Sequence, residues 1–125
     1  MPNKISNIAV LTSGGDSPGM NAAVRAVVRT CAFHNVGCFG VFQGYQGLID
    51  NKMESMNARS VKDIINKGGT ILKSARCLEF RTPKGRKMAY NNLKKNNIDG
   101  MVVIGGDGSF TGAMIFQKEF SFPVI

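Results

Sequence analysis

The stretch IAVLTSGGDSPGMN at residues 8–21 decides how the chain folds. Its apolar run Ile8–Leu11 predicts a buried strand, and the glycine-rich residues that follow predict a tight turn. Pro18 suits the first turn of a helix, with Asp16 or Ser17 as the cap. Apolar side chains then recur at helical spacing and give this helix one apolar face: Met20, Val24, Val27 and Cys31. The stretch therefore predicts a strand, a glycine turn and an amphipathic helix in succession.

The same order of elements recurs at residues 101–109, which read MVVIGGDGS. Met101–Ile104 give the clearest strand pattern in the chain, and the glycine turn after them leads into a second helix. Three apolar side chains of that helix are predicted to face inward, namely Phe110, Ala113 and Met114. The chain thus contains two strand–turn–helix units about ninety residues apart, although no internal sequence repeat is visible.

Shorter patterns fill the space between these units. A strand is predicted within residues 37–43, around Val41-Phe42, and a turn at residues 44–47. Residues 60–63 read SVKD and resemble a capping box, so a short helix is expected to run from there to the stop signal Gly68-Gly69.

Further elements follow in the second half of the chain. Thr70–Leu72 predict a brief strand, and residues 83–96 predict a helix that carries several lysines and arginines. Alternating strands and helices predict a three-layer α/β fold, with a parallel sheet covered by helices on both faces. Phe122–Ile125 have the composition of another buried strand. Because a natural terminus rarely falls inside a core strand, residues 1–125 are expected to be the amino-terminal part of a longer protein.

Composition limits the class of protein. The chain has 125 residues, of which 43% are hydrophobic and 19% charged, so one packed domain is expected. No apolar run approaches the roughly 20 residues that cross a bilayer, and no signal peptide is recognisable at the start. The cysteines Cys31, Cys38 and Cys77 form no CxxC pair, and one histidine makes a zinc site improbable. Reduced cysteines in a cytoplasmic protein are the natural interpretation.

The net charge of +8, from 16 basic and 8 acidic residues, favours anionic partners. Nucleic acid, phosphorylated metabolites and acidic lipid all remain open on charge alone, as does a solvated basic surface. The lysines and arginines are scattered, and the aromatic residues do not alternate with them as a stacking platform for nucleic acid would need. We therefore expect neither nucleic acid nor a membrane as the partner.

The two glycine turns are the candidate binding site. In a parallel sheet, ligands collect at the carboxyl ends of the strands, where glycine turns meet helix N-termini. Paired glycines let the backbone approach an anion, and Asp107 in the second turn adds a carboxylate suited to Mg²⁺. Neither turn has the GxxxxGK[ST] or GxGxxG pattern. A single turn of this kind can serve tight packing alone, but two of them favour phosphate binding.

Arg25 and Arg29 form a separate candidate site. They lie four residues apart on one face of the first predicted helix, and no acidic residue occurs between Ser17 and Asn35. Like charges at this spacing are mildly destabilising, so a bound anion would relieve them. The alternative is a solvated basic face.

In sequence the chain closely resembles the 6-phosphofructokinases. The resemblance rests on motifs in their family order, which are TSGGDSPGMNAAVRAVVR at 12–29, GYQGL at 44–48, GGT at 68–70, SARC at 74–77 and VVIGGDGS at 102–109. It extends over nearly the whole chain but accounts for less than half of that family's subunit. The turn GGDGS alone also occurs in NAD kinases and diacylglycerol kinases, whereas the long first motif and SAR are much more specific.

The resemblance implies roles for the nucleotide site. Gly15 corresponds to the glycine that lies against the ATP phosphates, and Tyr45 to an aromatic residue near the nucleotide. Arg76 and Cys77 correspond to the pair that flanks ATP, and Arg76 is the implied catalytic residue, because its guanidinium can spread positive charge over the transferred phosphoryl group. For Tyr45, a place in the core is the alternative, and for Arg76 it is an ordinary surface arginine.

The second turn has implied roles as well. Gly106, Asp107, Gly108 and Ser109 correspond to the turn that holds the nucleotide and the metal, with Asp107 as the Mg²⁺ ligand. Asp107 can at the same time cap a helix. Pyrophosphate-using relatives commonly have Asp at the position of Gly108, so glycine there implies ATP as the donor.

The implied reaction moves the γ-phosphoryl group of ATP to the C1 hydroxyl of fructose 6-phosphate with Mg²⁺. The family's catalytic base and most sugar-phosphate contacts belong to segments that follow Ile125, so the 125-residue piece is expected to be inactive alone. A cytoplasmic homotetramer is implied for the whole protein.

Regulation and rival functions stay open at the level of sequence. In bacterial members, arginines matching Arg25 and Arg29 bind a phosphate-bearing allosteric effector, but a further effector arginine is replaced here by Ala58, beside Arg59. One rival is another kinase with a GGDG turn, such as a NAD kinase, which would leave residues 12–21 and 74–77 without roles. The others are a non-catalytic nucleotide- or effector-binding module and a nucleic-acid-binding module.

Overall fold

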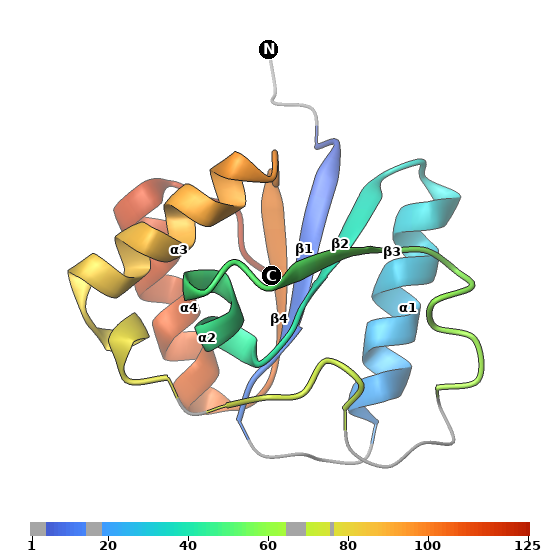
Figure 1. The fold of residues 1–125 in the computed structure, drawn as a ribbon, viewed down its shortest axis with the longest axis horizontal. Helices are drawn as coiled ribbons and strands as arrows, with labels where there is room; N and C mark the ends of the chain where they lie inside the picture. Colours follow the sequence, from blue (N-terminus) through green and yellow to red (C-terminus); the bar gives the residue numbers. More distant parts are fainter. Residues whose placement is uncertain (1–4, 15–18, 65–69, 76) are drawn as a thin grey trace.

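The strands form one sheet with helices on both of its faces (Figure 1). The computed structural model describes residues 5–14, 19–64, 70–75 and 77–125. Within these residues the sheet has the order β3-β2-β1-β4. The strands are β1 (Asn7–Thr12), β2 (Gly37–Val41), β3 (Met53–Met56) and β4 (Gly100–Ile104). The helices are α1 (Met20–Phe33), α2 (Gly44–Ile49), the 3-10 helix η1 (Glu79–Arg81), α3 (Pro83–Lys95) and α4 (Asp107–Phe120).

The sheet is mixed, which corrects the prediction of a purely parallel sheet. β1 pairs in parallel with β2 and with β4, as predicted. The edge strand β3 pairs antiparallel with β2, so that Val41 lies opposite Met53 and Cys38 opposite Met56. Nothing in the sequence analysis indicated β3. Its four residues, MESM, include Glu and Ser, which are poor strand formers and suit a short, charged edge.

The last residues lie alongside β4 as the predicted strand would, but they form only an isolated bridge, and Ile125 is exposed instead of buried. Met101 donates to the carbonyl of Pro123 at 3.0 Å, and Ile125 donates back to the carbonyl of Met101 at 3.0 Å. Val124 forms a parallel bridge with Met101. β4 is thus covered on its outer side by the segment that follows α4.

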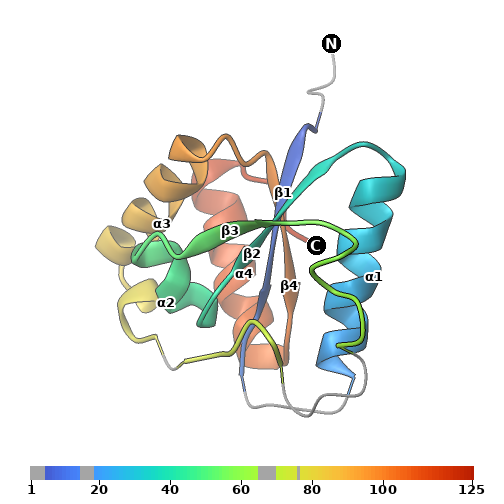
Figure 2. The same ribbon diagram turned by 45° about the vertical axis from the view of Figure 1, so that its right-hand side comes forward.

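Two cores lie on opposite faces of the sheet. α1 covers one face and α2, α3 and α4 cover the other, an arrangement on which the two views agree (Figures 1 and 2). β1 serves both cores through its alternation, since Ala9 and Leu11 pack toward α2–α4 while Val10 packs toward α1. All three side chains are fully buried. On α1, Met20, Val24 and Cys31 are buried as predicted, but Val27 is only half-buried and Val28 is buried in its place.

Two local predictions are wrong, because packing and side-chain hydrogen bonds decided what glycine and capping signals left open. Residues 44–47 were expected to turn, but they begin α2, because Tyr45, Leu48 and Ile49 bury one helical face. Residues 60–63 form turns instead of starting a helix. The Asn57 amide donates to the Ser60 hydroxyl and the Ser60 amide donates to Asn57 Oδ1, each at 3.1 Å. Gly68-Gly69, the expected stop signal, lie outside the described residues.

Thr70–Leu72 do not form the expected strand. Lys73 donates to the carbonyl of Thr70 at 3.2 Å and closes a turn, while the Leu72 carbonyl accepts from Gln43 at 2.9 Å. The Thr70 hydroxyl is 2.9 Å from the buried hydroxyl of Thr12, at the end of β1. Polar contacts therefore anchor the segment near the carboxyl end of β1.

The inward face of α4 differs from the prediction. Ala113 is buried as expected, but Phe110 is 45% exposed and Met114 63% exposed. The buried face instead runs through Ser109, Ala113 and Phe116. α4 is apolar on several sides, so its composition does not reveal which side packs on the sheet. None of the helices in the described part of the chain combines the length and apolarity required to cross a bilayer.

Candidate functional site

Successive strands are added first on one side of β1 and then on the other. From β1 the chain passes through α1 to β2 on one side, and it returns through α2 and α3, on the other face, to β4 on the opposite side of β1. β1 and β4 end side by side, with Thr12 opposite Ile104. In open α/β sheets, this topological switch point opens a crevice at the carboxyl ends of the strands, where ligands bind.

The two glycine turns meet at this point. The Ser13 amide donates to the carbonyl of Ile104 at 2.9 Å. A Cβ added at Gly105 would lie 2.6 Å from the Ser13 carbonyl oxygen and 2.8 Å from the Ser109 hydroxyl, so no side chain fits there. Gly14, with a φ of 87°, faces the same Ser109 hydroxyl. The turns after β1 and β4 therefore form one surface.

The second turn opens into the N-terminus of α4. Gly106 precedes the helix with an extended backbone, and its carbonyl accepts from Phe110 at 3.1 Å, the first hydrogen bond of the helix. No described side chain caps this end. The first N–H groups of a helix have no acceptor within the helix and carry the positive end of its dipole, so this end favours an anion.

A cleft of about 830 Å³ lies against these turns. Ser13 and Gly14 border it on the side of β1. Along α4 it is lined by residues of three successive turns, Gly108, Gly112 and Ile115 among them. The opposite wall is formed by Ser74, Ala75, Cys77, Phe80 and Arg81. The cleft thus has a glycine-rich end at the strand termini and continues along α4 for about 10 Å.

Hydrogen bonds between distant segments hold the walls in place. The Ser74 hydroxyl donates to the Gly14 carbonyl at 2.7 Å and ties the SARC segment to the first turn. The Tyr45 hydroxyl donates to the Ser109 carbonyl at 2.5 Å and ties α2 to the first turn of α4. The cleft is therefore shaped by contacts within the fold before any ligand is considered.

Tyr45 belongs to both the core and the cleft. It is 7% exposed, and its ring stacks on Phe80 with the ring centroids 4.0 Å apart and an interplanar angle of 11°. Burial raises the pKa of the Tyr45 hydroxyl, which keeps it protonated and able to donate. Both interpretations of Tyr45, core residue and aromatic residue at the site, are thus compatible with its position.

Cys77 contributes a half-buried thiol to the wall. Burial raises the pKa of this thiol, while backbone hydrogen bonds from Phe80 and Glu79 lower it in part. The net shift is upward, so the neutral thiol is the dominant form at neutral pH. Cys77 therefore lines the cleft with a neutral thiol, which suits packing against a ligand.

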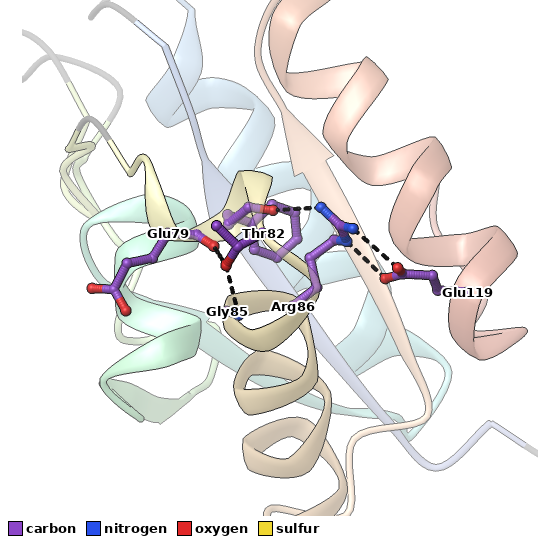
Figure 3. Close-up of polar contacts among 6 residues, drawn as sticks. Glu79, Thr82, Gly85, Arg86 and Glu119 are labelled. Carbon is purple, nitrogen blue, oxygen red and sulfur yellow. Dashed lines mark hydrogen bonds and ion pairs between the residues drawn. The ribbon is translucent and has the colours of Figure 1, made fainter.

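Arg86 lines the cleft from the second turn of α3 and is paired inside the protein (Figure 3). Its Nε donates to Glu119 Oε1 at 2.7 Å and its Nη2 donates to Glu119 Oε2 at 3.0 Å. Its Nη1 donates to the Phe80 carbonyl at 3.1 Å. One guanidinium of α3 therefore contacts both η1 and α4.

Comparison with known proteins assigns the chain to a family. Residues 7–125 match the family described as phosphofructokinase. The chain belongs to the phosphofructokinase family. It is 63% identical over 121 residues to a protein of Alkaliphilus metalliredigens named ATP-dependent 6-phosphofructokinase, which covers 97% of this chain and 38% of that protein. It is 52% identical over 118 residues to ATP-dependent 6-phosphofructokinase 2 of Bacteroides thetaiotaomicron, which covers 94% of this chain and 36% of that protein.

A solved phosphofructokinase shares the fold. The structure of phosphofructokinase from Saccharomyces cerevisiae superimposes with a TM-score of 0.89 at 49% identity, over 92% of this chain and 16% of the yeast chain. The chain thus spans well under half the length of the relatives it matches. The structure described above is an α/β domain of the phosphofructokinase family.

Within this phosphofructokinase domain, the structure brings four of the predicted site residues together. Tyr45, Cys77, Gly108 and Ser109 line one cleft. Gly106 and Asp107 adjoin it as the residue before α4 and the first residue of α4. Gly15 and Arg76 lie outside the described residues, so their roles remain predictions.

Arg25 and Arg29 lie elsewhere. Both are on α1, which covers the opposite face of the sheet from the elements that wall the cleft. Arg25 is half-buried and Arg29 exposed, and neither makes a salt bridge to a described residue. Ala58 is exposed in the turns that precede Val61.

Sequence reasoning missed several residues of the phosphofructokinase cleft. These are the residues after SARC and along α4, namely Phe80, Arg81, Arg86, Gly112 and Ile115. Spacing along α4 was an available signal, since Gly108, Gly112 and Ile115 follow the i, i+4, i+7 pattern of one helical face. No local signal marks Arg86, because its partner Glu119 is 33 residues away.

Proposed function

We propose that the cleft binds MgATP, with the triphosphate at the two glycine turns and the nucleoside along α4. We further propose that residues 1–125 are part of the nucleotide-binding domain of an ATP-dependent 6-phosphofructokinase, which transfers the γ-phosphoryl group to the C1 hydroxyl of fructose 6-phosphate. The observation that carries the proposal is the meeting of both turns at the N-terminus of α4, which no described side chain caps, inside one cleft at the switch point.

The two ends of the cleft suit the two ends of a nucleotide. At the carboxyl ends of β1 and β4, the backbone at Gly14 and in the first turn of α4 can offer N–H groups to phosphate oxygens. Farther along α4, the cleft is lined by Gly112, Ile115 and Phe80, which offer a mostly apolar surface against which a base can lie. A Cβ added at Gly112 would lie 3.6 Å from the Phe80 ring and 3.8 Å from Tyr45, so helix and rings are already in close approach.

Magnesium fits this donor set. The described residues contain no group of three or more His, Cys, Asp or Glu that could hold a metal by themselves. Mg²⁺ commonly binds through one or two carboxylates together with substrate phosphates and water, and Asp107 starts α4 beside the proposed phosphate position. Asp107 would hold the ion, which neutralises phosphate charge when bound, and Arg76 would stabilise the charge on the transferred group.

Gly108 supports ATP as the donor over pyrophosphate. It lines the cleft, and a Cβ added there would meet no atom within 4 Å. An aspartate at this position would therefore extend into open cleft space. Its carboxylate would occupy room for the nucleotide and repel the phosphates.

Calorimetric titration of the chain with MgATP and with magnesium pyrophosphate tests the proposal. We expect MgATP to bind more tightly, and Gly108→Asp to weaken its binding about tenfold or more, since like charges brought together cost at least about 1.4 kcal/mol. Ser55→Asp on the exposed edge strand β3 adds the same charge far from the cleft and should leave the affinity unchanged. Tighter binding of pyrophosphate, or equal effects of the two variants, would contradict the proposal.

We also propose that Arg25 and Arg29 bind a phosphate-bearing effector, and that the whole protein is a cytoplasmic homotetramer. The absence of acidic residues in the first turn of α1, together with two arginines that no described carboxylate pairs, supports the effector site. If the effector site exists, inorganic phosphate added to the MgATP titration should alter the affinity in the wild type and leave it unaltered in Arg29→Ala. Identical responses in both proteins would refute the site.

A further inference from the structure

One ion pair joins the two helices that flank the far part of the cleft (Figure 3). Arg86 of α3 and Glu119 of α4 meet side-on through two hydrogen bonds of 2.7 and 3.0 Å. The side chain of Arg86 is 9% exposed and that of Glu119 is 33% exposed. Such bidentate pairs fix direction as well as distance, because the planar guanidinium matches the carboxylate at two points.

The same guanidinium is connected to the aromatic wall. It donates to the Phe80 carbonyl, and the Phe80 ring stacks on Tyr45. Tyr45 in turn donates to the carbonyl of Ser109 in the first turn of α4. Arg86, Phe80 and Tyr45 are thus linked in a chain of contacts. This chain reaches α4 at two places, near its start at Ser109 and near its end at Glu119. These positions are about 15 Å apart along the helix.

The corner between η1 and α3 is rigid in itself. The Thr82 hydroxyl donates to the Glu79 carbonyl at 2.7 Å and accepts from the Gly85 amide at 3.0 Å, which caps α3. A Cβ added at Gly85 would run into the Glu79 carbonyl. Arg86 therefore projects from a fixed corner, and a change in its pairing alters the position of Phe80 relative to α4.

The charge balance at Arg86 determines what it can bind. Glu119 occupies two of its nitrogens and the Phe80 carbonyl a third, so the guanidinium borders the cleft with its charge already compensated. An unpaired arginine at the same place would attract phosphate. The pair thus keeps a cation beside the cleft from acting as an anion receptor.

We propose that Glu119 and Arg86 are positioning residues that make the cleft selective for a nucleotide over an inorganic polyphosphate. The pair holds Phe80 and α4 together as one wall of the cleft for the nucleoside, and it withholds the Arg86 charge from phosphate. This inference rests on the proposed binding of MgATP in the cleft.

The test compares two ligands in matched variants. Glu119→Gln keeps the shape of the side chain and removes its charge, and Arg86→Lys keeps the charge but cannot make the three-point contact. Glu79→Gln removes a carboxylate from η1 that is exposed and points away from Arg86, so it is the charge-matched control (Figure 3). Affinities for MgATP and for magnesium tripolyphosphate are measured by calorimetry, after circular dichroism and thermal unfolding have shown each protein to be folded at the assay temperature.

We expect Glu119→Gln and Arg86→Lys to lose about tenfold in affinity for MgATP, equivalent to about 1.4 kcal/mol. Their affinity for tripolyphosphate should be unchanged or higher, and Glu79→Gln should match the wild type for both ligands. If Glu119→Gln fails to fold, the milder Arg86→Lys decides the result.

Equal losses for both ligands would show a general loosening and would overturn the inference, as would an unchanged ratio of the two affinities. Failure of the proposed function looks different, because the wild type itself would then bind neither ligand. A wild type that binds MgATP, with variants that keep its selectivity, would refute the positioning role alone.

Discussion

Asn21 shows how one polar side chain supports the site from outside it. The residue is 3% exposed and lies in the first turn of α1. Its amide donates to the Ile64 carbonyl at 3.1 Å and accepts from the Ile71 amide at 2.8 Å. It thereby holds both ends of the stretch 64–71 against α1. Because this stretch leads directly to Ser74, Asn21 helps to place the wall that Ser74 joins to Gly14.

Replacing Asn21 tests this role at the level of a single residue. Asn21→Leu removes the side-chain partner of the buried Ile64 carbonyl and of the half-buried Ile71 amide, so we expect a loss of about 2–3 kcal/mol in the free energy of unfolding. Asn91→Leu, at an exposed position of α3, should change it by no more than about 0.5 kcal/mol. Urea titration followed by circular dichroism measures both. Similar losses in the two variants would show that the Asn21 contacts add nothing to stability.

At the scale of elements, local sequence pattern was sufficient to predict a helix or strand where the local signals agree. β1, β4, α1 and α3 lie close to their predicted positions because apolar runs, helical spacing and the Pro83 start signal agree there. β2 also formed within its predicted range. Local pattern failed for α2 and β3, whose conformations depend on what they pack against. Glycine in α2 opposed a helix that burial of Tyr45 and Leu48 nevertheless stabilises.

Two glycines inside helices give a matched test at this scale. Gly85→Ala places a methyl group against the Glu79 carbonyl, whereas Gly112→Ala makes only ordinary contacts with Phe80 and Tyr45. We expect Gly85→Ala to destabilise by about 1–3 kcal/mol, because the corner between η1 and α3 must open. Gly112→Ala should be neutral or stabilising by up to about 1 kcal/mol, since alanine favours a helix. Chemical denaturation of the two variants would contradict this account if their order were reversed.

At the scale of the whole molecule, the candidate site was predictable in one half. The phosphate end follows from glycine turns after adjacent strands, which sequence and fold rules place together. The other half depends on how α3 and α4 face each other across the cleft, and on contacts such as Arg86–Glu119 between residues far apart in sequence. No local sequence pattern shows how α3 and α4 face each other. Phe80, Arg86 and Ile115 could therefore be assigned to the site only from the three-dimensional structure.

The ion pair between Arg86 of α3 and Glu119 of α4 should make the stability of the protein depend on pH. The hydrogen bonds from Arg86 hold the pKa of Glu119 below its ordinary value of 4.5. A lowered pKa in the folded state stabilises the protein above the unfolded pKa, and this contribution disappears as the pH falls through the folded pKa. We therefore expect Glu119→Gln to be less stable than the wild type near neutral pH, with the difference shrinking below about pH 4.5. Urea midpoints of both proteins across this range measure it, and a difference independent of pH would contradict the expectation.

The hydrogen bonds Ser74–Gly14 and Tyr45–Ser109 span 60 and 64 residues of chain, so the cleft exists only when folding is complete. Any small molecule that occupies it must then be linked to the folding equilibrium by mass action. Saturation would raise the unfolding temperature with the logarithm of ligand concentration and would slow cleavage by proteases that attack opened chains. Survival of the polypeptide in the cell would accordingly follow the supply of its own ligand.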